Sequence, residues 1–383
     1  MMRAVIVTTH PIQNQAPLFR ALAGRFDLTV VFMMQQTPKG QASAGFGTEF
    51  VWDVPLLDGY PHAFAANIAR APTTNRRDGI VLSGHEELLA GLEPDAVLVM
   101  GWFPYGYLQV IRWARGNGVP LVCRGESNLL SHRSLLRDAI KTIYFPWLFR
   151  KFKTFAVIGQ RNREFYQNYG VGDFKLYDAP YSIDSHFFQE EFREHRSSAR
   201  KARPWRIGFA GKLISKKRVL DLFSAAARCR SRECLRLIII GDGPLRRDAE
   251  AFAERNNVSA EFRGFLNQSE IVEKGYADLD AIVLPSGENE TWGLVINEAM
   301  TGGIPAIVSN LVGCAPDLIE PGETGYVFPS GDVPALARCI DALIARLESG
   351  HNFASAVCAL VEKYSIDHTV TGLESAIAAA VSS

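Results

Sequence analysis

Short apolar runs alternate with amphipathic stretches along the whole chain, and this alternation predicts a parallel α/β fold. Residues 3–9 (RAVIVTT) and 28–33 (LTVVFM) are apolar runs with the length of one buried strand. Between them, apolar residues recur at near-helical spacing behind Pro17, a residue that suits the first turn of a helix. Strand, helix and strand at these lengths predict a right-handed parallel unit.

The same pattern continues in two blocks. In the first block we expect further strands at 95–100, 119–124 and 154–159 and helices at 107–116, 134–153 and 162–168. Residues 34–80 contain several Gly, Pro and Asn and predict an irregular segment with a strand near 50–52. In the second block we expect strands at 205–211, 235–241, 261–264, 281–285, 305–309 and 325–328 and helices at 218–229, 245–255, 269–276 and 332–347.

A stretch of different composition separates the two blocks. Residues 188–204 (FQEEFREHRSSARKARP) are dense in charge and poor in apolar side chains, which is typical of a linker. We therefore predict an N-terminal domain at 1–190, a charged linker at 191–204 and a C-terminal domain at 205–363. Both domains are expected to be α/β, each a Rossmann-like, doubly wound parallel sheet.

Composition excludes several classes of protein. The chain of 383 residues, 47% hydrophobic and 21% charged, is typical of a soluble globular protein of two domains. A formal net charge of zero argues against a nucleic-acid partner. No apolar run reaches the roughly 18 residues of a membrane span, and the N-terminal run is short for a signal peptide. Six scattered cysteines without a C-x-x-C pair indicate reduced thiols and a cytoplasmic location.

The stretch from Ser286 to Met300 (SGENETWGLVINEAM) carries the strongest chemical signal. It follows one predicted strand and precedes another, and Gly293 and Leu294 open a helix within it. The start of a helix presents unpaired N–H groups and a partial positive charge, which suit a phosphate. The carboxylates of Glu290 and Glu298 can accept hydrogen bonds from sugar hydroxyls. This stretch predicts a pocket for a phosphorylated sugar.

A basic loop follows the first strand of the second block. Gly211 and Lys212 are followed by Lys216, Lys217 and Arg218, just before a predicted helix. Cations at a helix start oppose the helix dipole, and their presence is easier to understand if an anion binds there. The loop predicts a diphosphate site, with a solvated charged turn as the alternative.

Two shorter motifs resemble cofactor and metal sites. Gly241-Asp242-Gly243-Pro244 resembles the start of a dinucleotide fingerprint, but Arg246 occupies the third glycine position, so we read a tight turn and predict no cofactor. Asp278-Leu279-Asp280 resembles a metal-binding D-x-D motif, but it immediately precedes an apolar strand. We interpret it as a false match and predict no metal.

Polar residues also follow strands of the first block. His10 and Gln13 lie in the turn after the first strand, and Glu126 follows the strand at 119–124. Because open α/β sheets bind ligands at the carboxyl ends of their strands, these residues are candidates for ligand binding, with His10 and Glu126 on the acceptor side. The alternatives are a structural turn histidine and a loop or cap glutamate.

The predicted helix at 134–153 is basic, aromatic and amphipathic. Such a stretch can lie on an anionic membrane surface. The alternative is a helix that packs on the sheet and extends its basic ends into solvent.

The second block resembles glycosyltransferase family 4, whose members are retaining enzymes of the GT-B fold. The motifs that carry the resemblance are GFAGKLISKKRVLDL (208–222), LIIIGDGP (237–244), RGFL (263–266), DAIVLPSGENETWGLVINEAMTGGIPAIVS (280–309) and GETGYVF with GD (322–332). Glu290 and Glu298 match the paired-glutamate motif of the family. The first block matches in architecture only, apart from residues 178–188, which look like a variant of the family's interdomain segment.

The resemblance implies a role for each matching residue. Glu298 would bind the nucleotide ribose, and Glu290 would contact the hydroxyls of the donor sugar. Lys212 and Lys217 would bind the diphosphate beside Gly211. The remaining donor-side residues implied are Trp292, Gly293, Leu294 and Val295 near the sugar and phosphates, and Gly264, Phe265 and Leu266 around the base. Gln13 of the first block is a further donor-binding candidate, because of its place after the first strand.

The family's mechanism implies that the leaving diphosphate helps to deprotonate the acceptor, without a metal or cofactor. Many members have a histidine after the fourth or fifth strand. This chain has Arg124, Gly125 and Glu126 there, with His132 a few residues later, and Glu126 is a candidate for the local substitute. The resemblance also implies that residues 364–383 form a C-terminal helix that packs back on the N-terminal domain.

The sequence thus predicts a glycosyltransferase that moves a hexosyl group from a nucleotide-diphosphate sugar to a hydroxyl of a glycan or lipid-linked acceptor, in polysaccharide biosynthesis at the inner face of a membrane. A non-catalytic sugar-nucleotide-binding protein and a nucleotide-sugar epimerase of the same fold are the alternatives. The broken glycine pattern disfavours a dehydrogenase.

Overall fold

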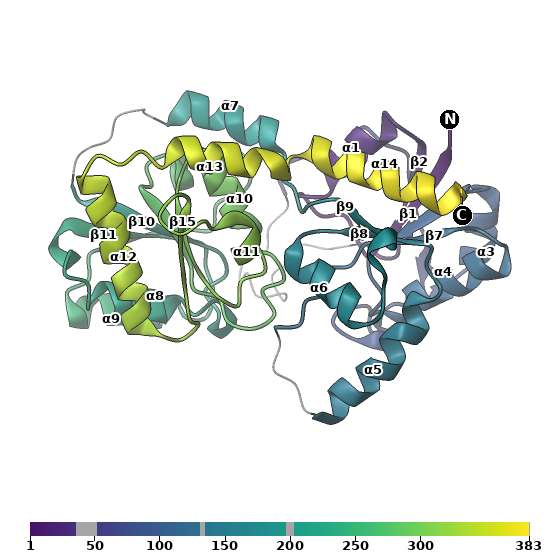
Figure 1. Ribbon diagram of the computed structural model, residues 1–383, viewed down its shortest axis with the longest axis horizontal. Coiled ribbons are helices and arrows are strands. Elements are labelled where there is room, and N and C mark those ends of the chain that lie inside the picture. Colours follow the sequence, from purple (N-terminus) through teal and green to yellow (C-terminus); the bar gives the residue numbers. More distant parts are fainter. Residues whose placement is uncertain (36–51, 131–134, 197–202, 383) are drawn as a thin grey trace. The chain divides into compact units, whose positions relative to one another are not determined.

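The computed structural model describes residues 1–35, 52–130, 135–196 and 203–382. Contacts within the chain divide it into two compact units. Unit 1 contains Met1–Gln36, Pro55–Ser182 and Ser365–Ser383, and unit 2 contains Thr37–Val54 and Ile183–Tyr364. The chain therefore leaves unit 1, forms unit 2 and returns to unit 1 at its end (Figure 1).

Unit 1 is built on one sheet of seven parallel strands in the order β3-β2-β1-β6-β7-β8-β9. The strands are β1 (Arg3–Thr8), β2 (Asp27–Phe32), β3 (His62–Phe64), β6 (Ala96–Val99), β7 (Leu121–Cys123), β8 (Thr154–Val157) and β9 (Leu176–Asp178). The helices are α1 (Ala16–Ala23), α3 (His85–Gly91), α4 (Tyr105–Gly116), α5 (Leu135–Phe149), α6 (Gln160–Asn168) and α14 (Ile366–Ser382), and a small antiparallel pair joins β4 (Ala66–Asn67) to β5 (Leu82–Ser83).

Alternate residues of each central strand enter two separate hydrophobic cores. In β6, Val97 and Val99 join the core beneath α4, α5 and α6, whereas Ala96 and Leu98 join the core beneath α1 and α14. This follows from the period of two along a strand, which sends neighbouring side chains to opposite faces. Both faces of the sheet are therefore covered by helices, as in a doubly wound fold.

The C-terminal helix α14 is part of the second of these cores. The Thr154 hydroxyl of β8 donates to the Ala376 carbonyl of α14 at 2.8 Å. Gly372 lies against β9 so closely that an added Cβ would be 1.9 Å from the Asp178 carbonyl oxygen. The last helix of the chain thus fills a face that the first 182 residues leave open.

Unit 2 is built on six parallel strands in the order β12-β11-β10-β13-β14-β15. They are β10 (Trp205–Ala210), β11 (Leu235–Ile240), β12 (Ala260–Gly264), β13 (Ala281–Leu284), β14 (Ala306–Ser309) and β15 (Gly325–Phe328). The helices are α7 (Ser185–His195), α8 (Val219–Ala226), α9 (Arg246–Asn256), α10 (Leu294–Thr301), α11 (Ala315–Leu318), α12 (Val333–Glu348) and α13 (Ala354–Val361).

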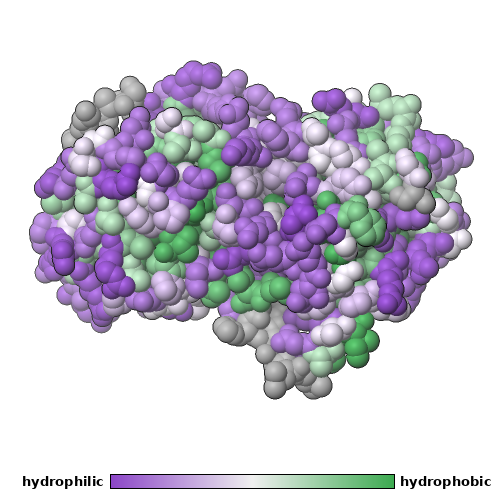
Figure 2. All heavy atoms as spheres, viewed as in Figure 1, coloured by the Kyte–Doolittle hydropathy of each residue, from purple (hydrophilic) through white to green (hydrophobic). Residues whose placement is uncertain are grey.

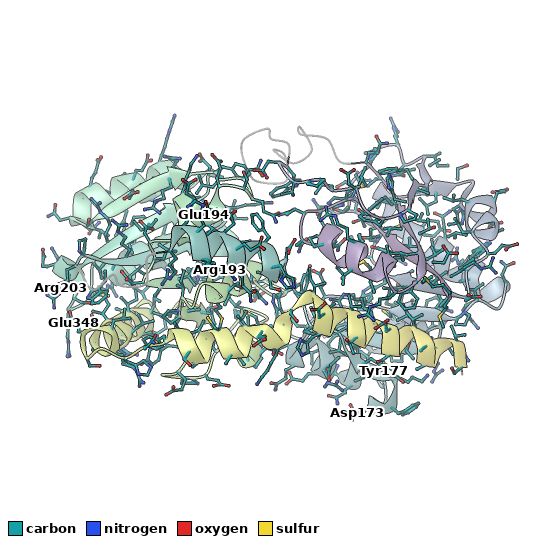
Figure 3. The ribbon with its side chains drawn as sticks, turned by 90° about the horizontal axis from the view of Figure 1, so that it is seen from above. Asp173, Tyr177, Arg193, Glu194, Arg203 and Glu348 are labelled. Atoms are coloured by element: carbon teal, nitrogen blue, oxygen red, sulfur yellow. The ribbon has the colours of Figure 1, made fainter. Side chains whose placement is uncertain are left out.

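Helices cover both faces of this sheet as well. α8 packs against α9 and α12, and α10 packs against α7 and α13 (Figure 1). Arg203, just before β10, forms an ion pair with Glu348 at the end of α12, and Figure 3 shows the two side by side. The predicted fold class, two Rossmann-like doubly wound parallel sheets, is confirmed.

The structure corrects the predicted linker and several elements. Residues 191–195 belong to α7, whose Phe188 and Phe192 are buried in unit 2, so the boundary between the units lies at Ser182 and not at 190. The predicted helix at 269–276 is a π-helical turn, Ile271–Tyr276. The strand expected near 50–52 falls largely outside the described residues, and Trp52 itself is not in a strand.

Replacing Gly372 by alanine tests the packing of α14 on the sheet. The added methyl group would force α14 away from β9, and we expect a loss of about 1–3 kcal/mol of stability. The measurement is the thermal unfolding midpoint. Gly116→Ala, in α4, is the matched control because its Cβ would meet no atom within 4 Å; there the midpoint should stay or rise. Equal midpoints for Gly372→Ala and wild type would contradict this packing.

Candidate functional site

The site in unit 2 begins where β13 ends and α10 starts. Gly293 caps α10 with a φ of +105°, and a Cβ at this position would lie 2.7 Å from the Leu284 side chain. Glycine therefore fits both the backbone turn and the close approach to β13. The turn brings the N–H groups of Leu294 and Val295, at the positive end of α10, to the carboxyl edge of the sheet.

Glu298 lies one turn further into α10 and is held by a residue that sequence reasoning missed. The Tyr276 hydroxyl donates to Glu298 Oε2 at 2.7 Å. Burial raises the pKa of Glu298, and this hydrogen bond offsets only part of the effect. A partly buried carboxylate whose ionised form is disfavoured by its surroundings is a candidate functional group.

The basic loop faces this helix start through an ion pair. Lys217 Nζ lies 2.6 Å from Glu290 Oε2, and the two side chains are 16% and 11% exposed. Burial by itself would raise the pKa of Glu290, but the charges of Lys217 and Lys216 outweigh it and hold the pKa below its usual value. Lys216 Nζ donates to the Asn289 carbonyl at 2.5 Å, which ties the same two loops together.

Positive charge exceeds negative charge in this loop. Burial lowers the pKa of Lys212, and repulsion from Lys217 and Lys216 lowers it further. Arg218 at the end of the loop pairs with Asp221 at 2.7 Å. An anion placed among the lysines would relieve their repulsion, so the loop is suited to a phosphate group.

The glycine motif after β11 supports the basic loop. A Cβ on Gly241 would lie 2.1 Å from the Gly211 carbonyl oxygen, and the Leu213 N–H donates to the Asp242 carbonyl at 2.9 Å. Arg246 turns back to pair with Asp242 at 3.0 Å. The motif is thus a tight turn that buttresses the basic loop.

Other donor-side candidates have more limited access. The indole of Trp292 is buried, donates to Asn297 Oδ1 at 2.8 Å and packs against Tyr364. Only its backbone is therefore available to a ligand. Gly264 ends β12 with a φ of +73°, and Phe265 and Leu266 follow it, both partly exposed.

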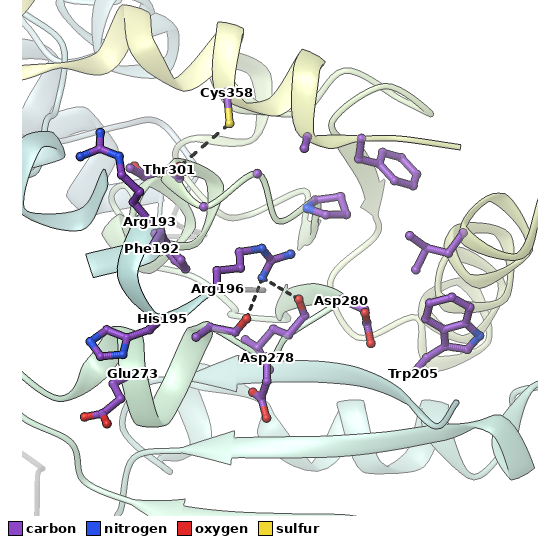
Figure 4. A pocket seen from close by; sticks show the side chains of 18 of the residues that line it. Phe192, Arg193, His195, Arg196, Trp205, Glu273, Asp278, Asp280, Thr301 and Cys358 are labelled. Carbon is purple, nitrogen blue, oxygen red and sulfur yellow. Dashed lines mark hydrogen bonds between the residues drawn. The ribbon is translucent and has the colours of Figure 1, made fainter. Parts of the chain in front are cut away.

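A second hollow in unit 2 lies at the opposite, amino-terminal edge of the sheet. Its lining includes Arg196, Asp278 and Asp280, just before β13 (Figure 4). Asp278 accepts from Arg263 at 2.8 and 2.9 Å and pairs with Arg206, and Asp280 accepts from the Arg206 N–H at 2.7 Å. Both carboxylates thus anchor the start of the sheet.

The candidates of unit 1 lie at the carboxyl edge of its own sheet. His10 follows β1, where its Nδ1 lies 3.0 Å from the Thr9 hydroxyl, and burial lowers its pKa. Burial therefore favours the neutral form of the ring. Gln13 lies in the same turn and is partly exposed.

Glu126 follows β7 and is oriented by a second residue that the sequence did not reveal. The Tyr181 hydroxyl donates to Glu126 Oε1 at 2.7 Å. Beneath this pair, the buried Arg124 guanidinium faces the Tyr181 ring at 6.0 Å and donates to the carbonyls of Ala179 and Pro180. Burial lowers the pKa of Arg124, and the nearby Tyr181 and Glu126 offset part of that effect. Glu126 is an exposed carboxylate with a fixed orientation.

Parts of the chain are similar in sequence to known proteins. Residues 190–357, which lie in unit 2, match the model of the family described as Glycosyl transferases group 1. The sulfoquinovosyl transferase SQD2 of Arabidopsis thaliana is 32% identical over 191 residues, 48% of this chain and 35% of that protein. A GDP-mannose-dependent alpha-mannosyltransferase of Mycobacterium tuberculosis is 36% identical over 126 residues, 33% of this chain and 30% of that protein. The matches thus span about a third of the length of these curated relatives.

Two solved structures share the fold over the whole chain. HepE of Anabaena, in complex with UDP, has a TM-score of 0.72 at 17% identity, with 98% of this chain and 100% of that chain covered. Sucrose-phosphate synthase of Thermosynechococcus elongatus has a TM-score of 0.70 at 14% identity, with 98% of each chain covered. At these identities the likeness shows the fold, which is the GT-B architecture.

Replacing Glu298 by glutamine tests whether its charge opposes folding. Because the folded pKa of Glu298 lies above its usual value of 4.5, ionisation disfavours the folded state at any pH above the folded pKa. Glu298→Gln keeps an acceptor for Tyr276, so its unfolding midpoint at pH 7 should exceed that of wild type, by about 2–4 °C per kcal/mol recovered. The gain should shrink as the pH falls through the folded pKa towards 4.5.

The matched control is Glu254→Gln, at an exposed position of α9. Its midpoint should follow wild type at every pH. A Glu298→Gln protein that is less stable than wild type at pH 7 would mean that the charge of Glu298 is compensated in the free protein.

Proposed function

We propose that the protein is a retaining, metal-independent glycosyltransferase that moves a hexosyl group from a nucleotide-diphosphate sugar to a hydroxyl of a glycan or lipid-linked acceptor. The observation that carries the proposal is the meeting of three features at one sheet edge. These are the crowded lysines of the basic loop, the start of α10, and the carboxylates of the buried Glu290 and the partly buried Glu298. Cations and N–H groups suit the diphosphate, and carboxylates suit the hydroxyls on either side of it.

The proposed donor site assigns a task to each group. Glu298 accepts hydrogen bonds from the ribose, and Glu290 from the donor sugar. Lys212 and Lys217 bind the diphosphate beside Gly211, close to the N–H groups of residues 292–295. Gly264, Phe265 and Leu266 border the base, and Gln13 is a further donor-binding candidate from unit 1. In the free protein Lys217 pairs with Glu290 at 2.6 Å, so a diphosphate would take over one partner of that pair.

The proposed reaction needs only groups of the substrates and of this chain. The bond between the anomeric carbon and the diphosphate breaks, and the acceptor oxygen bonds to that carbon on the same face. The proton of the acceptor hydroxyl passes to an oxygen of the departing diphosphate, whose charge Lys212 and Lys217 stabilise. Neither a metal nor a cofactor takes part.

On the acceptor side we propose Glu126 and His10, both at the carboxyl edge of the unit 1 sheet. Glu126, oriented by Tyr181, would accept a hydrogen bond from the acceptor. We also propose a cytoplasmic location at the inner face of a membrane, a role in polysaccharide biosynthesis and peripheral association through residues 134–153. The relative named above as a GDP-mannose-dependent alpha-mannosyltransferase supports transfer from a nucleotide sugar.

Two other functions would use the same donor site. A non-catalytic binding protein would bind the nucleotide sugar without transfer or hydrolysis, and the Glu126 position, where a histidine is expected, favours this alternative. An epimerase would convert the donor in the absence of any acceptor. Both are separated from the proposal by incubating the protein with donor alone and with donor plus acceptor.

Donor binding is tested with Glu298→Ala. Loss of charge-assisted hydrogen bonds to the ribose, about 1.5–3 kcal/mol, should weaken binding by roughly 10- to 150-fold. A thermal-shift screen of GDP-, UDP-, dTDP- and ADP-sugars identifies the donor, and calorimetric titration then gives the affinities. Glu254→Ala is the control and should bind as wild type does. If none of the four classes stabilises wild type, the donor site is disproved.

Catalysis is tested with Lys217→Gln. Removing a cation that faces the leaving diphosphate should lower kcat by about 100- to 1000-fold. Lys274→Gln, which removes an exposed cation of unit 2, should leave kcat unchanged. Addition of EDTA should also leave the wild-type rate unchanged, and NMR of the product should show the anomeric configuration of the donor. An inverted product or a rate abolished by EDTA would contradict the proposed mechanism.

A further inference from the structure

Helix α5 has two apolar faces, and only one of them is buried. Phe145, Leu148 and Phe149 belong to the core of unit 1 beneath the sheet. On the other side Ile140, Ile143 and Trp147, spaced three and four residues apart, are 58%, 77% and 50% exposed. Residues at this spacing share one face of a helix. A helix that packs on a sheet normally presents a polar outer face, so this stripe lacks an explanation within unit 1.

Cations lie around the end of this stripe. Lys151 Nζ sits 3.9 Å above the Trp147 ring, and Arg150 and Lys153 are exposed beside it. Burial lowers the pKa of Lys151, and the charges of Arg115 and Arg112 on α4 lower it further, which places all three cations close together. We define the α5 surface as these eight residues: Ile140, Ile143, Trp147, Arg112, Arg115, Arg150, Lys151 and Lys153.

The sequence around the surface is strongly basic, although the whole chain has no net charge. Residues 102–153 contain nine Lys and Arg but only two acidic residues, Glu126 and Asp138. Asp138 lies 3.5 Å from Lys141, so it does not neutralise the cations at the far end of α5. Figure 2 shows hydrophobic side chains over α5, and Figure 1 shows that the first turns of the helix extend beyond the sheet of unit 1.

We infer that the α5 surface binds an anionic lipid bilayer, with Ile140, Ile143 and Trp147 entering the headgroup boundary and the surrounding cations contacting lipid phosphates. Apolar side chains gain from leaving water, tryptophan suits the interface between headgroups and acyl chains, and each nearby cation is attracted by anionic lipid. No helix in the described ranges is long and apolar enough to cross a bilayer. We therefore expect α5 to lie on the bilayer surface and parallel to it.

Charge decides between a bilayer and a second copy of the chain. In a symmetric dimer the same patch meets itself, so Arg115, Arg150 and Lys151 of one copy would face the cations of the other. Like charges at such a contact are unfavourable. An anionic bilayer matches both the apolar stripe and its basic surroundings.

The test is flotation of the full-length protein with phosphatidylcholine vesicles that contain or lack phosphatidylglycerol. Wild type should float with the phosphatidylglycerol vesicles, and the bound fraction should fall at high salt. Ile143→Ser should weaken binding about tenfold or more, because it removes an exposed apolar side chain from the proposed contact. Arg150→Gln with Lys153→Gln should weaken binding by roughly fivefold per charge.

Matched controls lie on the opposite face of the same sheet. Val381→Ser in α14, 39% exposed, and Arg25→Gln beside α14 change the same residue types there and should bind as wild type does. All five substituted positions, at residues 25, 143, 150, 153 and 381, are exposed. The unfolding midpoint of each variant should therefore equal that of wild type, which distinguishes a loss of vesicle binding from a loss of folding.

Three results would overturn the inference. These are wild type that stays unbound with phosphatidylglycerol vesicles, Ile143→Ser that binds as well as Val381→Ser, and a wild-type dimer on size-exclusion chromatography that Ile143→Ser splits. The last result would assign the surface to a second copy. The inference rests on the proposed function only in giving membrane binding a biological role. Vesicle binding is measured without donor, and nucleotide binding is measured without vesicles, so either proposal can fail alone.

Discussion

The site of unit 2 depends on the ion pair between Lys217 and Glu290. Both side chains are largely removed from water, and removing charges from water is unfavourable unless each finds a partner. The pair satisfies Glu290 in the free protein, while burial and repulsion from neighbouring lysines lower the pKa values of Lys212 and Lys216. The loop therefore gathers several cations in a small space, and the carboxylate of Glu290 balances the charge of Lys217.

This constraint explains the surrounding geometry. Lys216 bonds to the Asn289 carbonyl, and the Gly287 N–H donates to the Lys216 carbonyl at 2.8 Å, so the basic loop and the loop before α10 are held as one body. The close approach of Gly241 to Gly211 supports that body from β11. Glu298 is a second acidic group at this edge, and burial raises its pKa, so its surroundings disfavour the ionised form. Two such charges at one sheet edge are better explained by a ligand than by stability.

The sequence was informative where function follows from position along the chain. The carboxyl ends of parallel strands meet at one edge, so Gly211, Glu290 and the start of α10 could be placed together from periodicity alone. Tyr276 and Tyr181 could not be found in this way. Tyr276 reaches Glu298 across 22 residues, and Tyr181 reaches Glu126 across 55, and neither contact has a periodic signature.

Helices α5 and α7 show a second limit of prediction from the sequence. The apolar residues of 134–153 fit a packed helix and a membrane helix equally well, because periodicity does not tell which of two apolar faces meets the sheet. In the structure Phe145 and Phe149 are buried in the core of unit 1, whereas Ile143 is exposed to solvent. In α7, the charged residues that suggested a linker are the outer face of a helix whose Phe188 and Phe192 are buried in unit 2. Composition averages over both faces and so hides that burial.

The buried Arg124 links the surroundings of Glu126 to the exit of the chain from unit 1. Its guanidinium bonds to the carbonyls of Ala179 and Pro180, and the Thr369 hydroxyl of α14 donates to the same Pro180 carbonyl at 2.7 Å. The next residue, Tyr181, orients Glu126. One short segment thus carries three tasks: it ends the sheet of unit 1, it receives the returning helix, and it positions Glu126. A change in the path of this segment must therefore change the orientation of Glu126, because the hydroxyl that fixes the carboxylate moves with the backbone.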